Sequence, residues 1–265
     1  MTKLRFTIKD PFGNDINFTT YQLNGKTVTR RSAPPNKQRI NNDPAFHKQK
    51  MNSQEFAAAA ILGKAFRNQD LKETLEHFKD TYMSSRLTGA CLKIIQKGSG
   101  EHGKREACIA TNGSTLEQFP LHKNKPLSYS FKAPYNILVS PNRDTITLQT
   151  SLSKAVVNGQ PKTATHAIFT LALATVSKHT YNNKTKSYQP EHPNQNGIGV
   201  VTESQPIKLT TSEIPVQIEL KVPGNEPLAN TTGIVVALGI TFGVQEHNAV
   251  YGILTGKAMN IIKIL

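Results

Sequence analysis

The part of this sequence that comes nearest to a chemical motif is the glycine-rich segment 98–105, GSGEHGKR. Its glycines and Lys104 have the spacing of a phosphate-binding P-loop, in which backbone amides surround the phosphates and the lysine contacts them. That motif also needs Ser or Thr after the lysine to hold magnesium, and this chain has Arg105 there. A P-loop leads from a strand into a helix, whereas the pattern here predicts a helix before the segment and a strand after it. We therefore expect a basic turn and not a nucleotide site.

The other residue types that could do chemistry form no recognisable constellation. The eight histidines include no i, i+4 pair on a predicted helix, and most lie in predicted loops without a nearby group of carboxylates. There is no Gly-x-Ser-x-Gly nucleophile elbow, and no pair of Asp or Glu residues is spaced for acid–base catalysis. The sequence therefore predicts no catalytic residue, no metal site and no cofactor, and it favours a protein that is not an enzyme.

The two cysteines, Cys91 and Cys108, lie in apolar patterns that predict burial. Two reduced thiols are the favoured interpretation, and a disulfide between them is the alternative. The first residues alternate between polar and apolar types and are followed by no apolar signal-peptide region. Together these features predict a cytoplasmic protein, or one exported by a route without an N-terminal signal peptide. No apolar run approaches the roughly 20 residues of a membrane span.

Positive charge is concentrated in the first half of the chain. Residues 1–132 carry 22 Lys and Arg against 11 Asp and Glu, whereas residues 133–265 carry 10 against 7. The candidate binding residues fall in the basic segment 26–50, and they are Arg30, Arg31, Lys37, Arg39, Lys48 and Lys50. Such a segment can follow a nucleic-acid backbone, with an affinity that falls steeply with salt. It can also bind an acidic patch on a neighbouring subunit, or simply keep the protein in solution.

Three helices are predicted after this basic segment. Asn52 with Glu55, and Asp70 with Glu73, resemble capping boxes and predict two helix starts. The third helix is predicted over residues 82–97 and ends at Gly98. The first helix carries small residues at Ala57, Ala60 and Gly63, so another backbone can approach this face closely. These three residues are the candidate self-association site.

Strand patterns occupy the remainder of the chain. Residues 1–31 predict short strands with a hairpin turn at Asn24-Gly25. From residue 116 onward the period is two, and residues 234–244 form a nearly continuous apolar run that predicts a strand covered on both faces. Residues 178–199 predict a long polar loop, which is either functional or disordered.

These patterns predict an α+β fold that is mainly β. The expected architecture is an antiparallel β-sandwich or barrel with a three-helix insert in the N-terminal half. The expected domains are residues 1–115, with the N-terminal strands, basic connector and helical insert, and residues 116–265, with the sandwich.

Several short motifs, in a fixed order, resemble those of a family of uncharacterised Bacteroidetes proteins of similar length. They are Asp43-Pro44-Ala45-Phe46, Glu55-Phe56 in an Ala-rich helix, Ser85-Arg86-Leu87-Thr88, Gly103-Lys104-Arg105 and the C-terminal Ala237-Leu238-Gly239-Ile240. The resemblance covers most of the chain. It implies no activity and no site residue, because the matching positions are typical of packing.

We expect a non-enzymatic structural subunit that self-assembles into a homo-oligomer or filament and uses its basic N-terminal arm for contacts. Extended strands, a helix face of small residues and an apolar terminal strand can all form contacts between copies. The alternative is a nucleic-acid-binding protein that contacts phosphates through the segment 26–50. A third hypothesis is a carbohydrate- or ligand-binding sandwich that uses residues 178–199, and it rests on analogy between folds.

Overall fold

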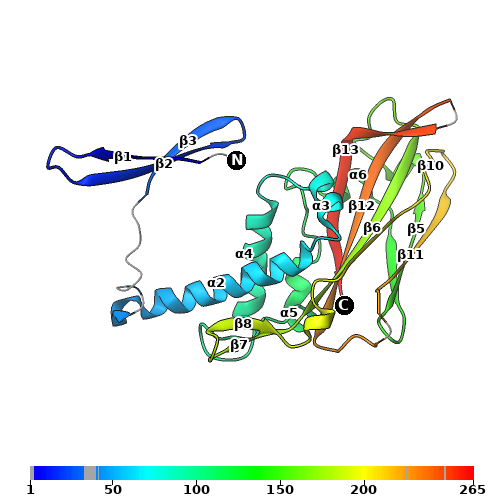
Figure 1. Ribbon diagram of the computed structural model, residues 1–265. Coiled ribbons are helices and arrows are strands. Elements are labelled where there is room, and N and C mark those ends of the chain that lie inside the picture. The colour runs from blue at the N-terminus through cyan, green and yellow to red at the C-terminus, as the bar shows by residue number, and fades with distance from the viewer. Residues whose placement is uncertain (1–2, 33–39, 41, 225, 248) are drawn as a thin grey trace. The chain divides into compact units, whose positions relative to one another are not determined.

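A computed structural model describes residues 3–32, 40, 42–224, 226–247 and 249–265 of the chain (Figure 1). They form two compact units, Met1–Met51 and Asn52–Leu265. The boundary between these units falls within the first long helix, and the predicted domains, residues 1–115 and 116–265, stay predictions. The described helices include none that is long and apolar enough to cross a membrane.

The first unit contains a three-stranded antiparallel sheet in the order β1-β2-β3. Its strands are β1 (Leu4–Lys9), β2 (Asp15–Leu23) and β3 (Lys26–Arg31). The predicted hairpin between β2 and β3 is present, because Asn24 and Gly25 both have positive φ, 51° and 74°. A two-residue turn with both residues in the left-handed backbone conformation matches the twist of the two strands. In the turn before β2, the Asp10 Oδ1 accepts hydrogen bonds from the Phe12 and Asn14 amides.

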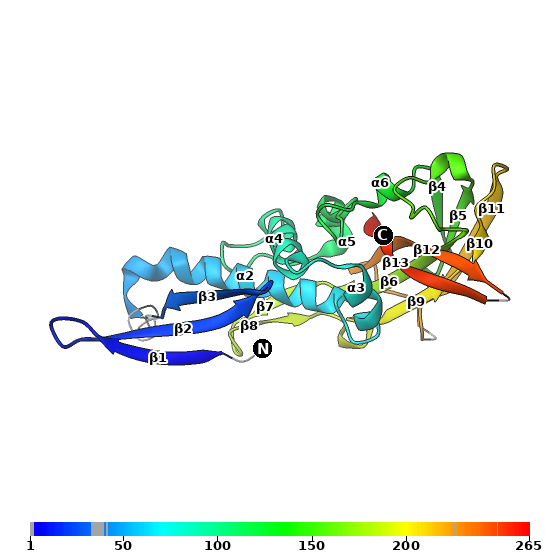
Figure 2. The same cartoon turned by 90° about the horizontal axis from the view of Figure 1, so that it is seen from above.

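The second unit is built on a central antiparallel sheet in the order β10-β6-β12-β13, in which β9 also pairs with β6. The strands are β6 (His166–Ser177), β9 (Gly199–Glu203), β10 (Ile207–Lys208), β12 (Thr232–Glu246) and β13 (Ala249–Ile264). A second sheet, β11-β5-β4, covers one face of it (Figure 2). This sheet consists of β4 (Tyr135–Val139), β5 (Thr145–Leu152) and β11 (Ile214–Lys221). A separate hairpin pairs β7 (His179–Asn182) with β8 (Ser187–Pro190).

Helices cover the opposite face of the central sheet (Figures 1 and 2). They are α2 (His47–Phe66), α3 (Lys72–Phe78), α4 (Met83–Gln96) and the one-turn α5 (Ile109–Asn112); another one-turn helix, α6 (Leu127–Ser130), packs near β13. The α+β, mainly β fold is therefore confirmed, with antiparallel sheets and a helical segment in the N-terminal half.

Two apolar cores explain why the central strands are so hydrophobic. Residues of β12 that face the second sheet, such as Leu238, pack with β5 and β11, whereas their neighbours such as Ala237 pack against the helices. All residues of β12 from Thr232 to Ile240 are buried. The predicted strand covered on both faces is confirmed, and burial on both faces is the physical cause of its continuous apolar run.

The first predicted helix start is wrong. The continuous helical stretch begins earlier, at η1 (Pro44–Phe46), where the Asp43 Oδ1 accepts a hydrogen bond from the Ala45 amide at 2.9 Å, and α2 follows directly. Ile40 and Asn42, before it, are also helical. Asp and Pro at these positions are a strong start signal. Asn52 and Glu55 consequently lie inside α2, and their side chains bind elsewhere. In the second capping-box pattern, Asp70 does not cap α3, because its carboxylate accepts from the Gly199 amide.

Residues 178–199 are not a long irregular loop. They contain β7, β8, the short turn η4 (Pro193–Gln195) and the first residue of β9. Tyr181 and Tyr188 face each other across the hairpin with ring centroids 5.4 Å apart, and Gln54 of α2 donates to the Tyr181 hydroxyl. The two aromatic residues therefore hold this polar segment against the helices.

Candidate functional site

The N-terminal sheet has one apolar face. Directly opposite residues of an antiparallel sheet share a face, and the register places Leu4, Phe6, Ile8, Ile16 and Phe18 together on one side. The Phe6 and Phe18 rings stack with their centroids 5.4 Å apart. The side chains nevertheless form no closed core, because Leu4 is 64% exposed and Ile8 is 51% exposed. We call these five residues the apolar face.

The opposite side of the same sheet is basic. Four cations share this side, which we call the basic face, and they are Arg5, Lys9, Lys26 and Arg30. Asp15 also lies there, directly opposite Lys9. The Arg30 guanidinium lies 5.8 Å from the centre of the Tyr21 ring on this face. The sheet therefore presents two surfaces of different chemistry.

The structure separates the predicted basic residues. Arg30 and Arg31 are neighbours in β3, so their side chains point to opposite faces; Arg31 lies opposite Phe18, beside the apolar face. Lys48 and Lys50 are exposed at the start of α2. Lys37 and Arg39 lie outside the described residues.

The predicted self-association residues have different environments. Ala57 is exposed, Ala60 is half-buried and Gly63 is buried. A Cβ atom on Gly63 would lie 3.7 Å from Leu87, an ordinary van der Waals distance, so this position already faces α4 of the same chain. Self-association through Ala57 and Ala60 stays a prediction.

The five residues of the apolar face were not among the predicted site residues. The alternation of Leu4, Phe6 and Ile8 is the sequence signal that points to them. Alternation alone, however, predicts a strand whose apolar face is buried. Only the structure shows that, among the described residues of this three-stranded sheet, no second layer covers that face.

The glycine-rich segment 98–105 contacts a carboxylate of the same chain, that of Glu55. The Glu55 carboxylate, only 2% exposed, accepts a hydrogen bond from the Gly103 amide at 2.9 Å. The Arg105 Nη1 lies 3.3 Å from the same Oε1, and the His102 Nε2 lies 4.0 Å from Oε2. This Glu55 network joins α2 to a loop almost fifty residues away in sequence.

Tyr188 fixes the same loop from β8. Its hydroxyl donates to the carbonyl oxygens of Gly103 and Arg105, and burial with the nearby Glu55 charge raises the pKa of Tyr188. As expected, a helix precedes the segment. The predicted strand after it is wrong, because only Ala107 forms a single β-bridge, with His179, before α5 begins at Ile109. The Glu55 carboxylate and the Tyr188 hydroxyl thus fix the loop to α2 and β8.

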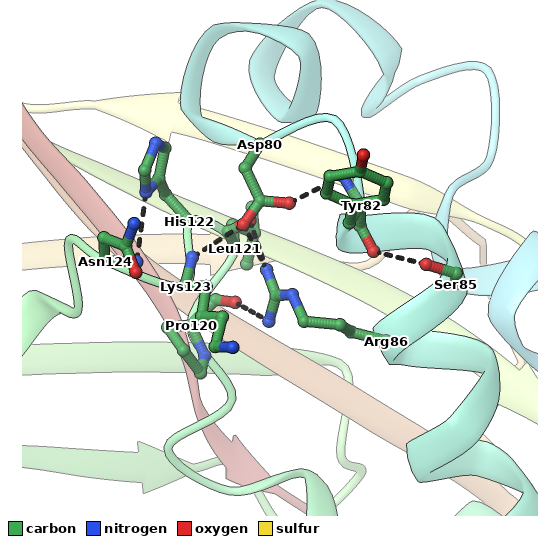
Figure 3. A network of polar contacts seen from close by, with 9 residues as sticks. All are labelled: Asp80, Tyr82, Ser85, Arg86, Pro120, Leu121, His122, Lys123 and Asn124. Atoms are coloured by element: carbon green, nitrogen blue, oxygen red, sulfur yellow. Dashed lines mark hydrogen bonds and ion pairs between the residues drawn. The ribbon is translucent and has the colours of Figure 1, made fainter. Parts of the chain in front are cut away.

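A second polar cluster ties α4 to residues 120–123 (Figure 3). The Arg86 guanidinium donates to the Asp80 Oδ2 and to the carbonyl oxygens of Pro120 and Leu121, each at 2.9 Å. Asp80 also accepts from the Lys123 amide at 2.7 Å. Burial raises the pKa of Asp80, but these hydrogen bonds and the Arg86 charge outweigh burial and leave the pKa below its ordinary value. These contacts fix α4 to residues 120–123.

Gly98 ends α4 where the sequence predicts, but for a different reason. Its φ is not left-handed; instead, a Cβ atom there would lie 2.0 Å from the Glu106 carbonyl oxygen. Gly98→Ala should therefore lower the free energy of unfolding by about 2 kcal/mol, because the loop backbone must move. Urea denaturation followed by circular dichroism measures this change.

Gly89 in the same helix provides the matched control. It is exposed, and a Cβ atom there would meet no other part of the chain within 4 Å. Gly89→Ala should stabilise the protein by about 1 kcal/mol through helix propensity alone. If both substitutions changed the free energy of unfolding equally, the close contact between Gly98 and the Glu106 carbonyl oxygen would not be the reason for glycine at position 98.

Both cysteines are buried and free, as the favoured interpretation predicts. Burial raises the pKa of the Cys91 thiol to about 12, which keeps the thiol protonated and unreactive at neutral pH. Among the described residues, no three His, Cys, Asp or Glu side chains are grouped so that they could hold a metal ion.

Comparisons with protein-family models, with curated proteins and with solved structures found no match. The resemblance to a family of uncharacterised Bacteroidetes proteins stays a prediction. The case for a function therefore rests on the surfaces described above.

Proposed function

We propose that this chain is a non-enzymatic subunit of a homo-oligomeric assembly, and that the apolar face of its N-terminal sheet binds the same face of another copy. The observation that carries the proposal is that Leu4, Phe6, Ile8, Ile16 and Phe18 share one side of a three-stranded sheet and remain accessible. Contiguous exposed apolar side chains are typical of protein–protein contacts.

The energetics of a small sheet favour this proposal. A three-stranded sheet is stable when an apolar face is covered, and each fully buried Leu, Ile or Phe side chain contributes about 1.5–3 kcal/mol. A two-fold contact covers the face of both copies at once, since each apolar face meets an identical one. Arg31, on the flank of this face beside Phe18, would lie at the rim, where its charge stays in water.

A mass measurement with matched variants tests the proposal. Size-exclusion chromatography with light scattering should show that the mass of the full-length protein rises with concentration to that of a defined oligomer. Phe6→Ser should shift the protein to the monomer, because Phe6 lies at the centre of the apolar face and stacks on Phe18. We expect Phe6→Ser to weaken association at least about tenfold. This corresponds to roughly 1.4 kcal/mol of association free energy, which the burial of one such side chain can contribute.

Phe12→Ser is the control for this experiment. Phe12 lies in the turn between β1 and β2 and is 90% exposed, so the substitution removes an equally large aromatic group away from the apolar face. It should leave the oligomer intact. A monomer at every concentration, or equal effects of the two serine variants, would rule out assembly through this face.

The basic face supports a second candidate function, the binding of nucleic acid through phosphate contacts. Arg5, Lys9, Lys26 and Arg30 lie on one side of the sheet, and this spacing can follow a phosphate backbone. In a mobility-shift series, Lys26→Gln with Arg30→Gln should weaken binding uniformly across sequences and reduce the salt dependence. A failure of the unsubstituted protein to shift DNA or RNA at low salt would exclude this function.

A further inference from the structure

A pocket with a volume of about 570 Å³ lies in the second unit. Its walls come from the end of α2, the loop that follows it, the β7–β8 hairpin and the segment before β9. This volume is in the range of pockets that bind small molecules. Ile61, Tyr188 and Pro190 provide apolar surface, and the other lining residues are mainly polar or charged.

His179 lines this pocket and has an unused hydrogen-bond acceptor. The side chain is fully buried, and its Nδ1 lies 2.9 Å from the Ser177 carbonyl oxygen. Because a carbonyl oxygen only accepts, Nδ1 carries the proton, and burial lowers the pKa of His179 so that the ring is neutral. Nε2 then has a free lone pair, and it has no hydrogen-bond partner among the described residues.

A buried acceptor without a partner costs stability, so it calls for an explanation. Its neighbour Tyr188 is fully engaged with the loop of the Glu55 network. A hydroxyl group of a bound molecule, or one water held by that molecule, would satisfy Nε2. An ammonium group is a poorer partner, because the charged residues of the pocket are cations.

Lys64 and Arg67 are those cations, and no Asp or Glu is among the described residues that line the pocket. Arg67 is held in place, since its Nε donates to the Gly63 carbonyl oxygen and its Nη1 to the Ser84 hydroxyl, both at 3.1 Å. Lys64 is exposed and free to reach a ligand. The Asp70 carboxylate, just after this loop, already accepts from the Gly199 amide. The pocket therefore favours an anion.

We propose that this pocket binds a small hydroxylated anion, namely a monosaccharide that carries a carboxylate or a phosphate. Lys64 and Arg67 contact the anionic group. The His179 Nε2, which the pocket wall covers, accepts a hydrogen bond from a hydroxyl, directly or through one water, once a small movement of that wall uncovers it. Ile61, Tyr188 and Pro190 pack against the carbon skeleton. This site does not depend on assembly through the apolar face.

Calorimetric titration of the full-length protein tests the site with four probes. Glucuronate and glucose 6-phosphate carry both hydroxyls and an anionic group, glucose lacks the anion, and cyclohexanecarboxylate lacks the hydroxyls. At least one of the two anionic sugars should bind about tenfold or more tightly than both controls, since each missing contact corresponds to roughly 1.4 kcal/mol. Equal binding of all probes, or no binding of either anionic sugar, would overturn the proposal.

Variants of the full-length protein then test the named contacts. Lys64→Gln should weaken binding of the preferred sugar about tenfold. Lys93→Gln, which changes another exposed lysine, on α4, should have no effect. His179→Asn keeps an amide donor near the Nδ1 position and removes Nε2, and it should also weaken binding. Unchanged affinity in Lys64→Gln, or in a His179→Asn protein whose melting temperature is retained, would exclude the corresponding contact and with it the proposed site.

Discussion

Glu55→Ala should lower the free energy of unfolding by about 3 kcal/mol, as is typical when one partner of a buried ion pair is removed. The carboxylate is the acceptor for the Gly103 amide and the counter-ion for Arg105. Without it, the buried Gly103 amide and the partly exposed Arg105 guanidinium lose their partner. Glu55→Gln should cost less, because its amide oxygen can still accept from Gly103. Equilibrium denaturation in urea measures both variants.

Glu76→Ala is the control for the Glu55 variants. Glu76 on α3 pairs with Lys79, the residue that follows the helix, and the Glu76 side chain is 57% exposed. Exposed ion pairs of this kind contribute little to stability, so Glu76→Ala should change the free energy of unfolding by no more than about 0.5 kcal/mol. If Glu55→Ala proved as mild as Glu76→Ala, the loop 98–105 would not depend on the Glu55 network.

Arg86→Met should also cost about 3 kcal/mol, because it breaks several hydrogen bonds of a partly buried charged group at once. Methionine retains much of the apolar volume of the arginine stem, so the loss reports mainly on the polar contacts. It leaves the Pro120 and Leu121 carbonyl oxygens and the Asp80 carboxylate without their common donor (Figure 3). Arg86→Lys should be more stable than Arg86→Met but less stable than the unsubstituted protein, since an ammonium group cannot make the several hydrogen bonds that the planar guanidinium makes at once.

The matched control is Lys93→Met on the same helix. Lys93 is exposed, and its replacement should change the free energy of unfolding by no more than about 0.5 kcal/mol. A small effect of Arg86→Met in the same denaturation experiment would show that α4 is held to residues 120–123 by its apolar contacts alone.

The fold class could be predicted from the sequence because it depends on local periodicity. Alternation marks the strands of both sheets, and the continuous apolar run of β12 reflects burial on two faces. The hairpin at Asn24-Gly25 was predictable for the same reason, since two adjacent residues determine the turn.

Features that depend on distant partners could not be predicted. Glu55 resembles a capping residue in its local sequence, whereas its actual partners, Gly103 and Arg105, are about fifty positions away. The polar composition of residues 178–199 is typical of a loop, but Tyr181 and Tyr188 pack together and form a hairpin. The pocket beside His179 likewise requires four segments that only the tertiary structure brings together.

The apolar face is an intermediate case. The alternation of Leu4, Phe6 and Ile8 was visible in the sequence, and so was the excess of cations nearby. What the sequence could not show is that both surfaces belong to the same three strands, with Arg30 on one side and Arg31 on the other. The register of the sheet therefore changes the hypothesis from one basic arm to a sheet with two chemically different faces.

Cysteine cross-linking measures assembly through the apolar face most directly. Ile8 and Thr7 are adjacent in β1, but only Ile8 lies on the apolar face, and both native cysteines are buried. With a short bismaleimide, Ile8→Cys should yield a covalent dimer of the full-length protein, whereas Thr7→Cys should remain largely monomeric. Equal cross-linking at both positions, or none at Ile8→Cys, would contradict assembly through this face.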